Sequence, residues 1–461
     1  MNGASTSWSR DLSAFAAGLT YENVPAHVIA NARLRLLDTI GVCFASVGMD
    51  YAEAIRGMIE EQGAGTAVTM FGSGRAAAAW GALYNGALAH GNDYDDTHSV
   101  ALIHISGVVI PTVVAMGERC GASGAEVLTA AVAAYETGLR IGIATPTGFH
   151  ERGFHATGVC GAYAAAIGAA KVLKLDAERM AQALGIVGSQ ASGLLEFLSD
   201  GAWVKRLHPG WAAHAGIVAA QLAARGYIGA TAVLEGRYGL YNAYSARPLP
   251  DRAALFARLG TEWETLNTDF KPYPCGHLSH PYMDCARDLR TRHKLAPDDI
   301  VSIELRVPRA AVPILCEPRA DKLRPQNAYA ARFSLPYAVA VVLLLGRAGI
   351  DEFSEERIRD PQILALAART SYVVDDSLPF PQAFPGWVKL KLRDGRDVEQ
   401  RMDASRGSRA HPMSDAEMRE KFIANISRRL SPAKAQTIWD AGSRLEAVAD
   451  IREFTALLSA Q

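Results

Sequence analysis

Long apolar segments rich in alanine and glycine fill the first 260 residues, and they restrict the fold more than any other feature of the chain. In residues 23–47 the apolar positions recur at the spacing of an amphipathic helix. The same reasoning predicts helices over residues 76–90, 127–143, 157–173, 177–198 and 209–226. Because no stretch here alternates apolar and polar residues as a strand does, we expect no sheet in this part of the chain.

The pattern changes after about residue 266. Residues 299–307 carry a mixed strand signal, and two strand-like runs in residues 387–402 flank Arg393-Asp-Gly-Arg396, where Asp-Gly favours a hairpin turn. Residues 331–345 predict a buried helix, and helical patterning returns from Ser414. We therefore predict a mainly α fold with a large all-helical part and a smaller α+β part. The helical segment from Ser414 to the C-terminus either extends the α+β part or folds back onto the all-helical part.

Composition and charge exclude several classes of protein. The 461 residues have a net charge of −1 and no basic run, so no nucleic-acid partner is expected. The start lacks a signal-peptide pattern, and the longest apolar run, residues 338–346, is far shorter than the ~20 residues of a membrane span. We therefore expect a cytoplasmic protein without a membrane partner. The six cysteines are scattered, which argues against disulfides and iron–sulfur clusters.

The segment from residue 90 to 104 carries the densest group of polar side chains. Three carboxylates lie within four residues, at Asp93, Asp95 and Asp96. One interpretation is that Asp95 or Asp96 caps a helix in a solvated loop. A second is a metal site, although no spaced ligand pair such as H-E-x-x-H supports it. A third is that Asp93 orients a histidine, while Thr97 and His104 face a substrate.

Three further loops carry histidines. His155 precedes an Ala/Gly-rich helix, whose N-terminus favours a bound carboxylate, unless Thr157 is simply its N-cap and His155 lies on the surface. The run Lys205-Arg-Leu-His208 suits a polyanionic substrate, or is an ordinary exposed basic turn. His277 and His280 either belong to the site, or one of them packs in the interior and the other is exposed.

The ordered set of these motifs resembles the MmgE/PrpD family. The matching segments are His90-Gly-Asn-Asp-Tyr-Asp-Asp-Thr-His98, Gly153-Phe-His-Ala-Thr-Gly158, Ser189-Gln-Ala-Ser-Gly193, Lys205-Arg-Leu-His-Pro-Gly210, Lys271-Pro-Tyr-Pro-Cys275, Ala331-Arg-Phe-Ser334 and His411-Pro-Met413. The family includes 2-methylcitrate dehydratase, cis-aconitate decarboxylase and iminodisuccinate epimerase. The resemblance implies a small di- or tricarboxylate substrate, no metal and no organic cofactor. It also implies a homodimer, a helical domain over residues 1–266 onto which 406–461 fold back, and an α+β lid domain over 267–405.

The resemblance also implies which residues form the site. Residues that match the catalytic positions of the family are Asp93, Thr97, His104, His155 and Lys205, and His277 matches after a one-residue shift. The chain departs from the decarboxylases at Val312 and from the epimerase at His150, since each position holds a tyrosine in the respective relative.

We therefore expect a lyase that uses acid–base, carbanion-type chemistry, with a 2-methylcitrate dehydratase-like reaction first. The alternatives are an epimerase or racemase of a dicarboxylate, a cis-aconitate-type decarboxylase and, outside the enzymes, a carboxylate-binding relative without activity. Either His104 or His155 would move the proton at carbon, and either His277 or His280 would serve the leaving hydroxyl or the other face. Substrate carboxylates would be bound by Arg152, Lys205 and His208.

Overall fold

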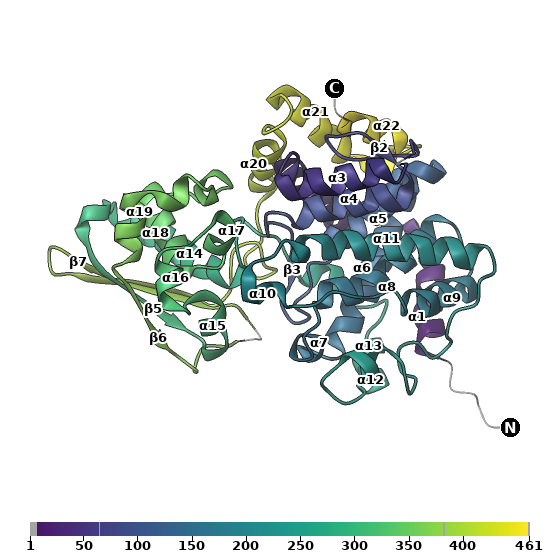
Figure 1. Ribbon diagram of the computed structural model, residues 1–461, viewed down its shortest axis with the longest axis horizontal. Coiled ribbons are helices and arrows are strands. Elements are labelled where there is room, and N and C mark those ends of the chain that lie inside the picture. Colours follow the sequence, from purple (N-terminus) through teal and green to yellow (C-terminus); the bar gives the residue numbers. More distant parts are fainter. Residues whose placement is uncertain (1–6, 64, 381–382, 460–461) are drawn as a thin grey trace. The chain divides into compact units, whose positions relative to one another are not determined.

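The computed structural model describes residues 7–63, 65–380 and 383–459 (Figure 1). Helices account for 57% of the chain and strands for 9%, which confirms the predicted mainly α fold class. The chain forms two compact units. The helical unit comprises the chain up to Gly91, Asp95–Thr268 and the part from Asp415 onward, and the mixed unit comprises Asn92–Tyr94 and Asp269–Ser414.

Five helices form the centre of the helical unit. Helix α11 packs against α8 and α4, α6 packs against α8, and α5 contacts both α4 and α8 (Figure 1). Small residues permit this close packing: a Cβ added to Gly86 would lie 2.7 Å from the Cα of Gly210. The bounds are α4 Ala78–His90, α5 Ser106–Cys120, α6 Gly124–Ile143, α8 Ala156–Val172 and α11 Val204–Ala224.

Outer helices cover this centre. Helix α1 packs against α9, and α20 packs against α2 although nearly the whole chain separates them in sequence. The longer outer helices are α1 Trp8–Gly18, α2 Ala26–Ser46, α3 Asp50–Glu61, α9 Ala177–Val187, α20 Asp415–Ile426 and α21 Pro432–Gly442. Short helices are α7 Gly148–Glu151, α10 Phe197–Asp200, α12 Leu240–Tyr244, α13 Arg252–Phe256 and α22 Arg452–Thr455.

Two expectations for the helical unit were wrong. The helix predicted over residues 177–198 ends at Val187, because the chain then turns through a segment that includes Gly193 with a φ of 129°. A small antiparallel pair, β1 Val68–Thr69 with β2 Arg75–Ala76, occurs where no sheet was expected. Its local pattern is too short to detect, and a distant side chain holds it: the Glu118 carboxylate accepts the amide hydrogen of Thr69.

The mixed unit is built on a four-stranded sheet in the order β6-β5-β7-β8. The predicted strand and hairpin are confirmed as β5 Ile300–Val307, β7 Gly386–Leu392 and β8 Asp397–Met402. Strand β6 Thr370–Val374, parallel to β5, was missed because most of its residues are exposed and carry no alternating pattern. The helices are α14 His280–His293, α15 Val312–Leu315, α16 Arg319–Leu323, α17 Ala328–Ala331, α18 Leu335–Leu345 and α19 Pro361–Ala367.

Two further short strands lie outside this sheet, β3 Thr97–His98 and β4 Thr268–Asp269. Among the described residues, no helix combines the length and the apolar character that crossing a lipid bilayer would require.

Candidate active site

Four histidines of the helical unit lie together, and we call them the imidazole cluster: His90, His104, His155 and His208. They come from the end of α4, the loop before α5, the N-cap of α8 and the first turns of α11. The ring centroids of His90 and His104 are 4.8 Å apart, and those of His155 and His208 are 5.2 Å apart. Residues more than 100 positions apart in sequence therefore form one group of titratable rings.

The fully buried ring of His90 is held by Asp95. Its Nδ1 lies 2.8 Å from one carboxylate oxygen of Asp95 and 3.0 Å from the other. A carboxylate in this position holds the Nδ1–H tautomer and favours protonation of the ring. Asp95, for which helix capping was one of the interpretations of the sequence, thus makes an acid–histidine pair within the helical unit.

The next carboxylate, Asp96, organises the loop that carries His104. Its side chain accepts from the amide of Ser106 at the start of α5 and forms an ion pair with the buried Arg35 at 3.2 Å. Burial raises the pKa of Asp96 to about 6, although the Arg35 guanidinium acts in the opposite direction. Its backbone carbonyl oxygen lies 2.7 Å from Nδ1 of His104. The contact with Ser106 fits the interpretation that Asp96 caps a helix, but the solvated loop of that interpretation is wrong, because Asp95 and Asp96 are both buried.

His104 is positioned by two threonines as well. The hydroxyl oxygen of Thr97 lies 3.2 Å from its Nδ1, and the hydroxyl oxygen of Thr157 accepts its backbone N–H at 3.0 Å. Thr157 is therefore not the N-cap of α8, a place taken by His155. The last histidine of the loop, His98, pairs with Glu264 at 3.3 Å.

His155 and His208 contact each other directly. Their Nδ1 atoms are 3.0 Å apart. Burial lowers the pKa of His155 well below its usual value, and neighbouring His90 and Lys205 add to this effect. Burial also lowers the pKa of His208 to about 4, again with a contribution from the Lys205 ammonium. His155 is buried and not on the surface, and Lys205 is 6% exposed, so neither surface alternative holds for these two residues.

Part of the imidazole cluster has the composition of a metal site. One nitrogen from each of His90, His104 and His155 lies within 4.8 Å of the others. Three histidines can bind zinc, which prefers Zn–N distances of about 2.0–2.1 Å. To bind one ion at such distances, the three rings would need to move slightly closer together. The expectation that no metal takes part therefore stays a prediction that requires a direct test.

Asp93 lies in the mixed unit, in the three-residue segment Asn92–Tyr94. Its carboxylate pairs with the fully buried Lys271 at 3.3 Å. Arg332 donates to both the side-chain and the backbone oxygen of Asn92, at 2.9 and 3.0 Å. Sequence reasoning did not propose Lys271 or Arg332 as site residues, although both lie in segments that match the family. That match was the only signal for them.

His277 and His280 also belong to the mixed unit, and both are buried. The expected alternative of one packed and one exposed ring is therefore wrong. Nε2 of His277 lies 2.9 Å from the hydroxyl oxygen of Ser405, and Nε2 of His280 lies 3.2 Å from the carbonyl oxygen of Cys275. Burial and the Lys271 ammonium lower the pKa of His277 to about 3. Burial also lowers the pKa of His280 well below its usual value, so the neutral form is favoured in both rings.

Three other residues named from the sequence lie elsewhere in the units. Arg152 is exposed just after α7, so its assignment as a carboxylate ligand stays a prediction. Burial lowers the pKa of His150 to about 4. Val312 begins α15 in the mixed unit.

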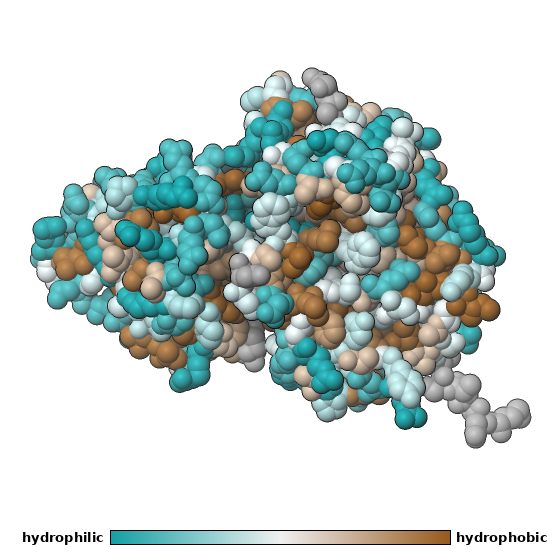
Figure 2. Space-filling view, viewed as in Figure 1, coloured by the Kyte–Doolittle hydropathy of each residue, from teal (hydrophilic) through white to brown (hydrophobic). Residues whose placement is uncertain are grey.

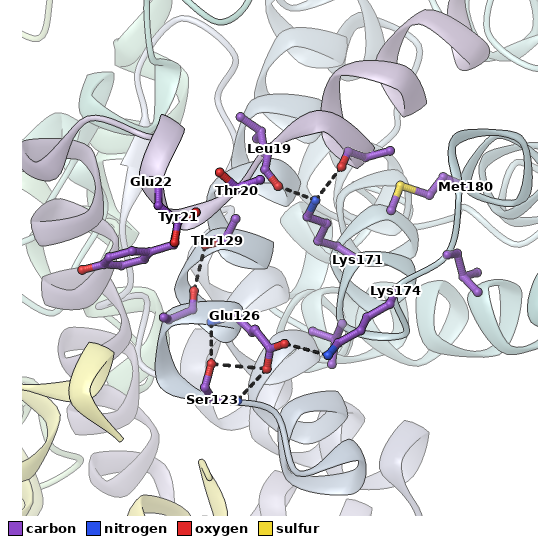
Figure 3. Close-up of a pocket in the computed structure, with 14 residues that line it drawn as sticks. Leu19, Thr20, Tyr21, Glu22, Ser123, Glu126, Thr129, Lys171, Lys174 and Met180 are labelled. Carbon is purple, nitrogen blue, oxygen red and sulfur yellow. Dashed lines mark hydrogen bonds and ion pairs between the residues drawn. The ribbon is translucent and has the colours of Figure 1, made fainter. Parts of the chain in front are cut away.

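A cavity of about 730 Å³ lies on the helical unit, away from the imidazole cluster (Figure 3). The Lys171 ammonium points to the backbone and donates to the carbonyl oxygens of Ala17 and Leu19. Lys174 pairs with Glu126, which also caps α6. Because both ammonium groups bind the protein itself, we assign this cavity a structural role in joining the ends of α1, α6 and α8.

Comparison with known proteins places these groups in context. The MmgE/PrpD N-terminal domain matches residues 10–253, and the MmgE/PrpD C-terminal domain matches residues 273–447. The chain belongs to the MmgE/PrpD family. This finding confirms the resemblance seen in the sequence motifs.

Curated members of the family indicate the class of chemistry. The chain is 27% identical to the cis-aconitate decarboxylase-like protein oryM of Aspergillus oryzae, over 95% of this chain and 94% of that protein. It is 28% identical to human cis-aconitate decarboxylase, over 96% and 92%. The match to 2-methylcitrate dehydratase of Cupriavidus necator is 28% over 38% of each chain. Decarboxylases and dehydratases are lyases, so this member of the family is an enzyme of the lyase class.

Proposed function

We propose that this chain is a cofactor-independent lyase of a small di- or tricarboxylic acid, and that it dehydrates a 2-methylcitrate-like hydroxy acid. The imidazole cluster beside Lys205 is the observation that carries the proposal. It offers two rings, His155 and His208, whose pKa burial lowers so that the neutral form is favoured, next to an ammonium group that attracts a carboxylate. Neutral imidazoles in a buried site are suited to accept and donate protons.

The proposed reaction needs two proton transfers. One ring, that of His155 or His104, takes the proton from the carbon next to a carboxylate, while Lys205 and His208 bind carboxylate oxygens. A double bond then forms as the carbon–oxygen bond breaks, and the hydroxyl leaves as water with a proton from a second imidazole. For that second role we keep His277 and His280 as candidates, together with Asp93 for orientation, Thr97 for a hydrogen bond to the substrate, and Arg152 for a further carboxylate.

Decarboxylation of a cis-aconitate-like acid is the second candidate. It is favoured by the cis-aconitate decarboxylases, which match nearly the full length of the chain, whereas the dehydratases match little more than a third. Carbon dioxide then leaves and a ring donates a proton to carbon. Val312 stands against it, because the resembling decarboxylases have a tyrosine there. Epimerisation of a dicarboxylate is third, since it uses the same deprotonation.

A panel of 2-methylcitrate, citrate, cis-aconitate and iminodisuccinate, followed by NMR in D₂O, separates these reactions. A new alkene signal identifies a dehydratase, released carbon dioxide a decarboxylase, and deuterium exchange without net conversion an epimerase. His155→Ala should lower turnover by about 10²–10⁴-fold without loss of the folded state. Full activity of this variant on the true substrate would overturn the assignment of the imidazole cluster as the active site.

The same proposal includes a cytoplasmic homodimer without nucleic-acid or membrane partners. Large apolar side chains are exposed around α10 and the start of α11, among them Leu198 at 64% and Trp203 at 51%. Figure 2 shows apolar patches on this face of the helical unit. Apolar side chains of this size at a surface are typical of an interface. Light scattering would report the mass of a dimer, and Trp203→Glu should shift it toward the monomer.

A further inference from the structure

The contact between His155 and His208 joins two like nitrogen atoms. A neutral imidazole carries one N–H, on either Nδ1 or Nε2. Two Nδ1 atoms 3.0 Å apart form a hydrogen bond only when one ring donates and the other accepts. The donor ring is then the Nδ1–H tautomer with a basic Nε2, and the acceptor ring carries its proton on Nε2. The pair thus offers one base and one acid.

The surroundings keep both rings neutral. His155 is 3% exposed, and burial lowers its pKa well below the usual value. Burial and the Lys205 ammonium lower the pKa of His208 to about 4. Because neither ring is an imidazolium at pH 7, a single proton lies between the two Nδ1 atoms. One ring is then the Nδ1–H tautomer and the other the Nε2–H tautomer.

Tight packing holds the rings in place. A Cβ added to Gly193, whose φ is 129°, would lie 3.3 Å from the ring of His208. The backbone of the same glycine accepts the amide hydrogen of His155 at 2.9 Å. Phe197 lies edge-on to both rings, with centroids 5.9 Å from that of His155 and 6.0 Å from that of His208. Such packing resists the ring rotations that would break the contact.

We propose that His155 and His208 act as a coupled base and acid, which carry a proton from carbon to the leaving hydroxyl across their Nδ1–Nδ1 hydrogen bond. This inference rests on the proposed dehydration. It gives His208, in place of His277 or His280, the role of the acid that protonates the leaving hydroxyl, in addition to carboxylate binding. Nε2 of His155 accepts the proton from carbon, and its Nδ1 proton passes to Nδ1 of His208. The Nε2 proton of His208 then joins the hydroxyl, the carbon–oxygen bond breaks, and water leaves.

These proton transfers leave the charge of both rings unchanged. Both rings end neutral with their tautomers exchanged, so no imidazolium accumulates beside Lys205 in a buried environment, where a charge is costly. Proton exchange with water after product release restores the starting tautomers. An isolated base would instead hold an imidazolium against the ammonium of Lys205.

His208→Asn tests the relay in the full-length enzyme. The amide of asparagine can retain the hydrogen bond to Nδ1 of His155, but it cannot pass a proton on. We expect kcat to fall about 10²–10⁴-fold with KM changed little. A rise in KM with kcat retained would show carboxylate binding only, and unchanged kinetics would show a packing role only; either result overturns the relay. The control is His214→Asn on the same helix, whose ring packs against Trp80 and Trp211 and should be dispensable for turnover.

A spectroscopic measurement tests the pair without any substrate. Imidazole ¹⁵N shifts of histidine-labelled protein at pH 7, assigned with His155→Asn and His208→Asn, should show one Nδ1–H ring and one Nε2–H ring. Identical tautomers, or an imidazolium in either ring, would overturn the coupled pair. Complementary tautomers in a protein without activity on the substrate panel would instead refute the proposed function and, with it, the dehydration step.

Discussion

The ammonium of Lys271 lies 3.3 Å from the carboxylate of Asp93 and donates to the backbone oxygen of the same residue at 3.0 Å. Both side chains are almost completely shielded from solvent. Asp93 has a φ of 51°, a left-handed conformation that a residue other than glycine adopts at some cost. The ion pair therefore compensates two charges that are shielded from solvent, and it holds the Asn92–Tyr94 segment in the mixed unit.

Removal of one partner should destabilise the protein strongly. Lys271→Met leaves the Asp93 carboxylate buried and unpaired, so we expect a loss of about 3–5 kcal/mol in the free energy of unfolding, measured with urea. The control is Lys389→Met, which breaks the exposed pair with Asp397 and should cost no more than about 1 kcal/mol. Equal midpoints for the two variants would contradict the role of the buried pair.

Lys205 should control protonation of the rings beside it. Replacing it with methionine removes a positive charge that disfavours imidazolium, so the pKa of His208 should rise from about 4 toward its usual value, and that of His155 should rise too. Histidine NMR titration measures both. Lys171→Met, at the cavity of Figure 3, is the control and should leave both values unchanged. A fall in either pKa on loss of Lys205 would show that the sign of this electrostatic interaction is wrong.

Stability should decline in mild acid. The folded-state pKa values of His208 and His277, about 4 and about 3, lie below the unfolded value of about 6.5, so the unfolded chain binds more protons at intermediate pH. The contribution of these two histidines to the free energy of unfolding is complete above pH 6.5. It is lost as the pH falls through about 4 for His208 and about 3 for His277.

Asp96 opposes this trend, because its raised pKa of about 6 gives a contribution that is lost as the pH rises through 6. Burial raises the pKa of Asp38 and Glu136 as well, and these two carboxyls act in the same direction as Asp96. Because the histidines with a lowered pKa outnumber these three carboxyls, we expect a lower urea midpoint at pH 4.5 than at pH 7.5. His277→Gln cannot be protonated and should reduce the difference, whereas a change at the exposed His27 should not. A midpoint that rises in acid would be incompatible with neutral buried histidines.

Chelators should leave turnover unchanged. The proposed chemistry uses imidazoles, an ammonium group and no metal, although His90, His104 and His155 are close enough to be ligands. Activity before and after dialysis against EDTA, together with elemental analysis of the protein, decides the point. Loss of activity that zinc restores would make these three histidines a metal centre.

The family motifs could be recognised from sequence, but the pairing of their residues could not. The segment from His90 to His98 predicts an acid–histidine pair, yet three carboxylates in it have similar local surroundings. In the structure Asp95 binds His90, Asp96 binds Arg35, and Asp93 binds Lys271. The choice depends on partners brought from distant parts of the chain, which a local pattern does not contain.

Helical periodicity and small residues in the first 260 positions determined the mainly α fold class, because amphipathic spacing is a local property of the chain. The ordered motifs likewise determined the family. Only the tertiary structure decided that His155 and His208 meet through their Nδ1 atoms and that both are neutral. The physical reason is that hydrogen bonding between distant residues and burial from water are set by the packing of helices, and these two effects control the tautomer and the pKa of an imidazole.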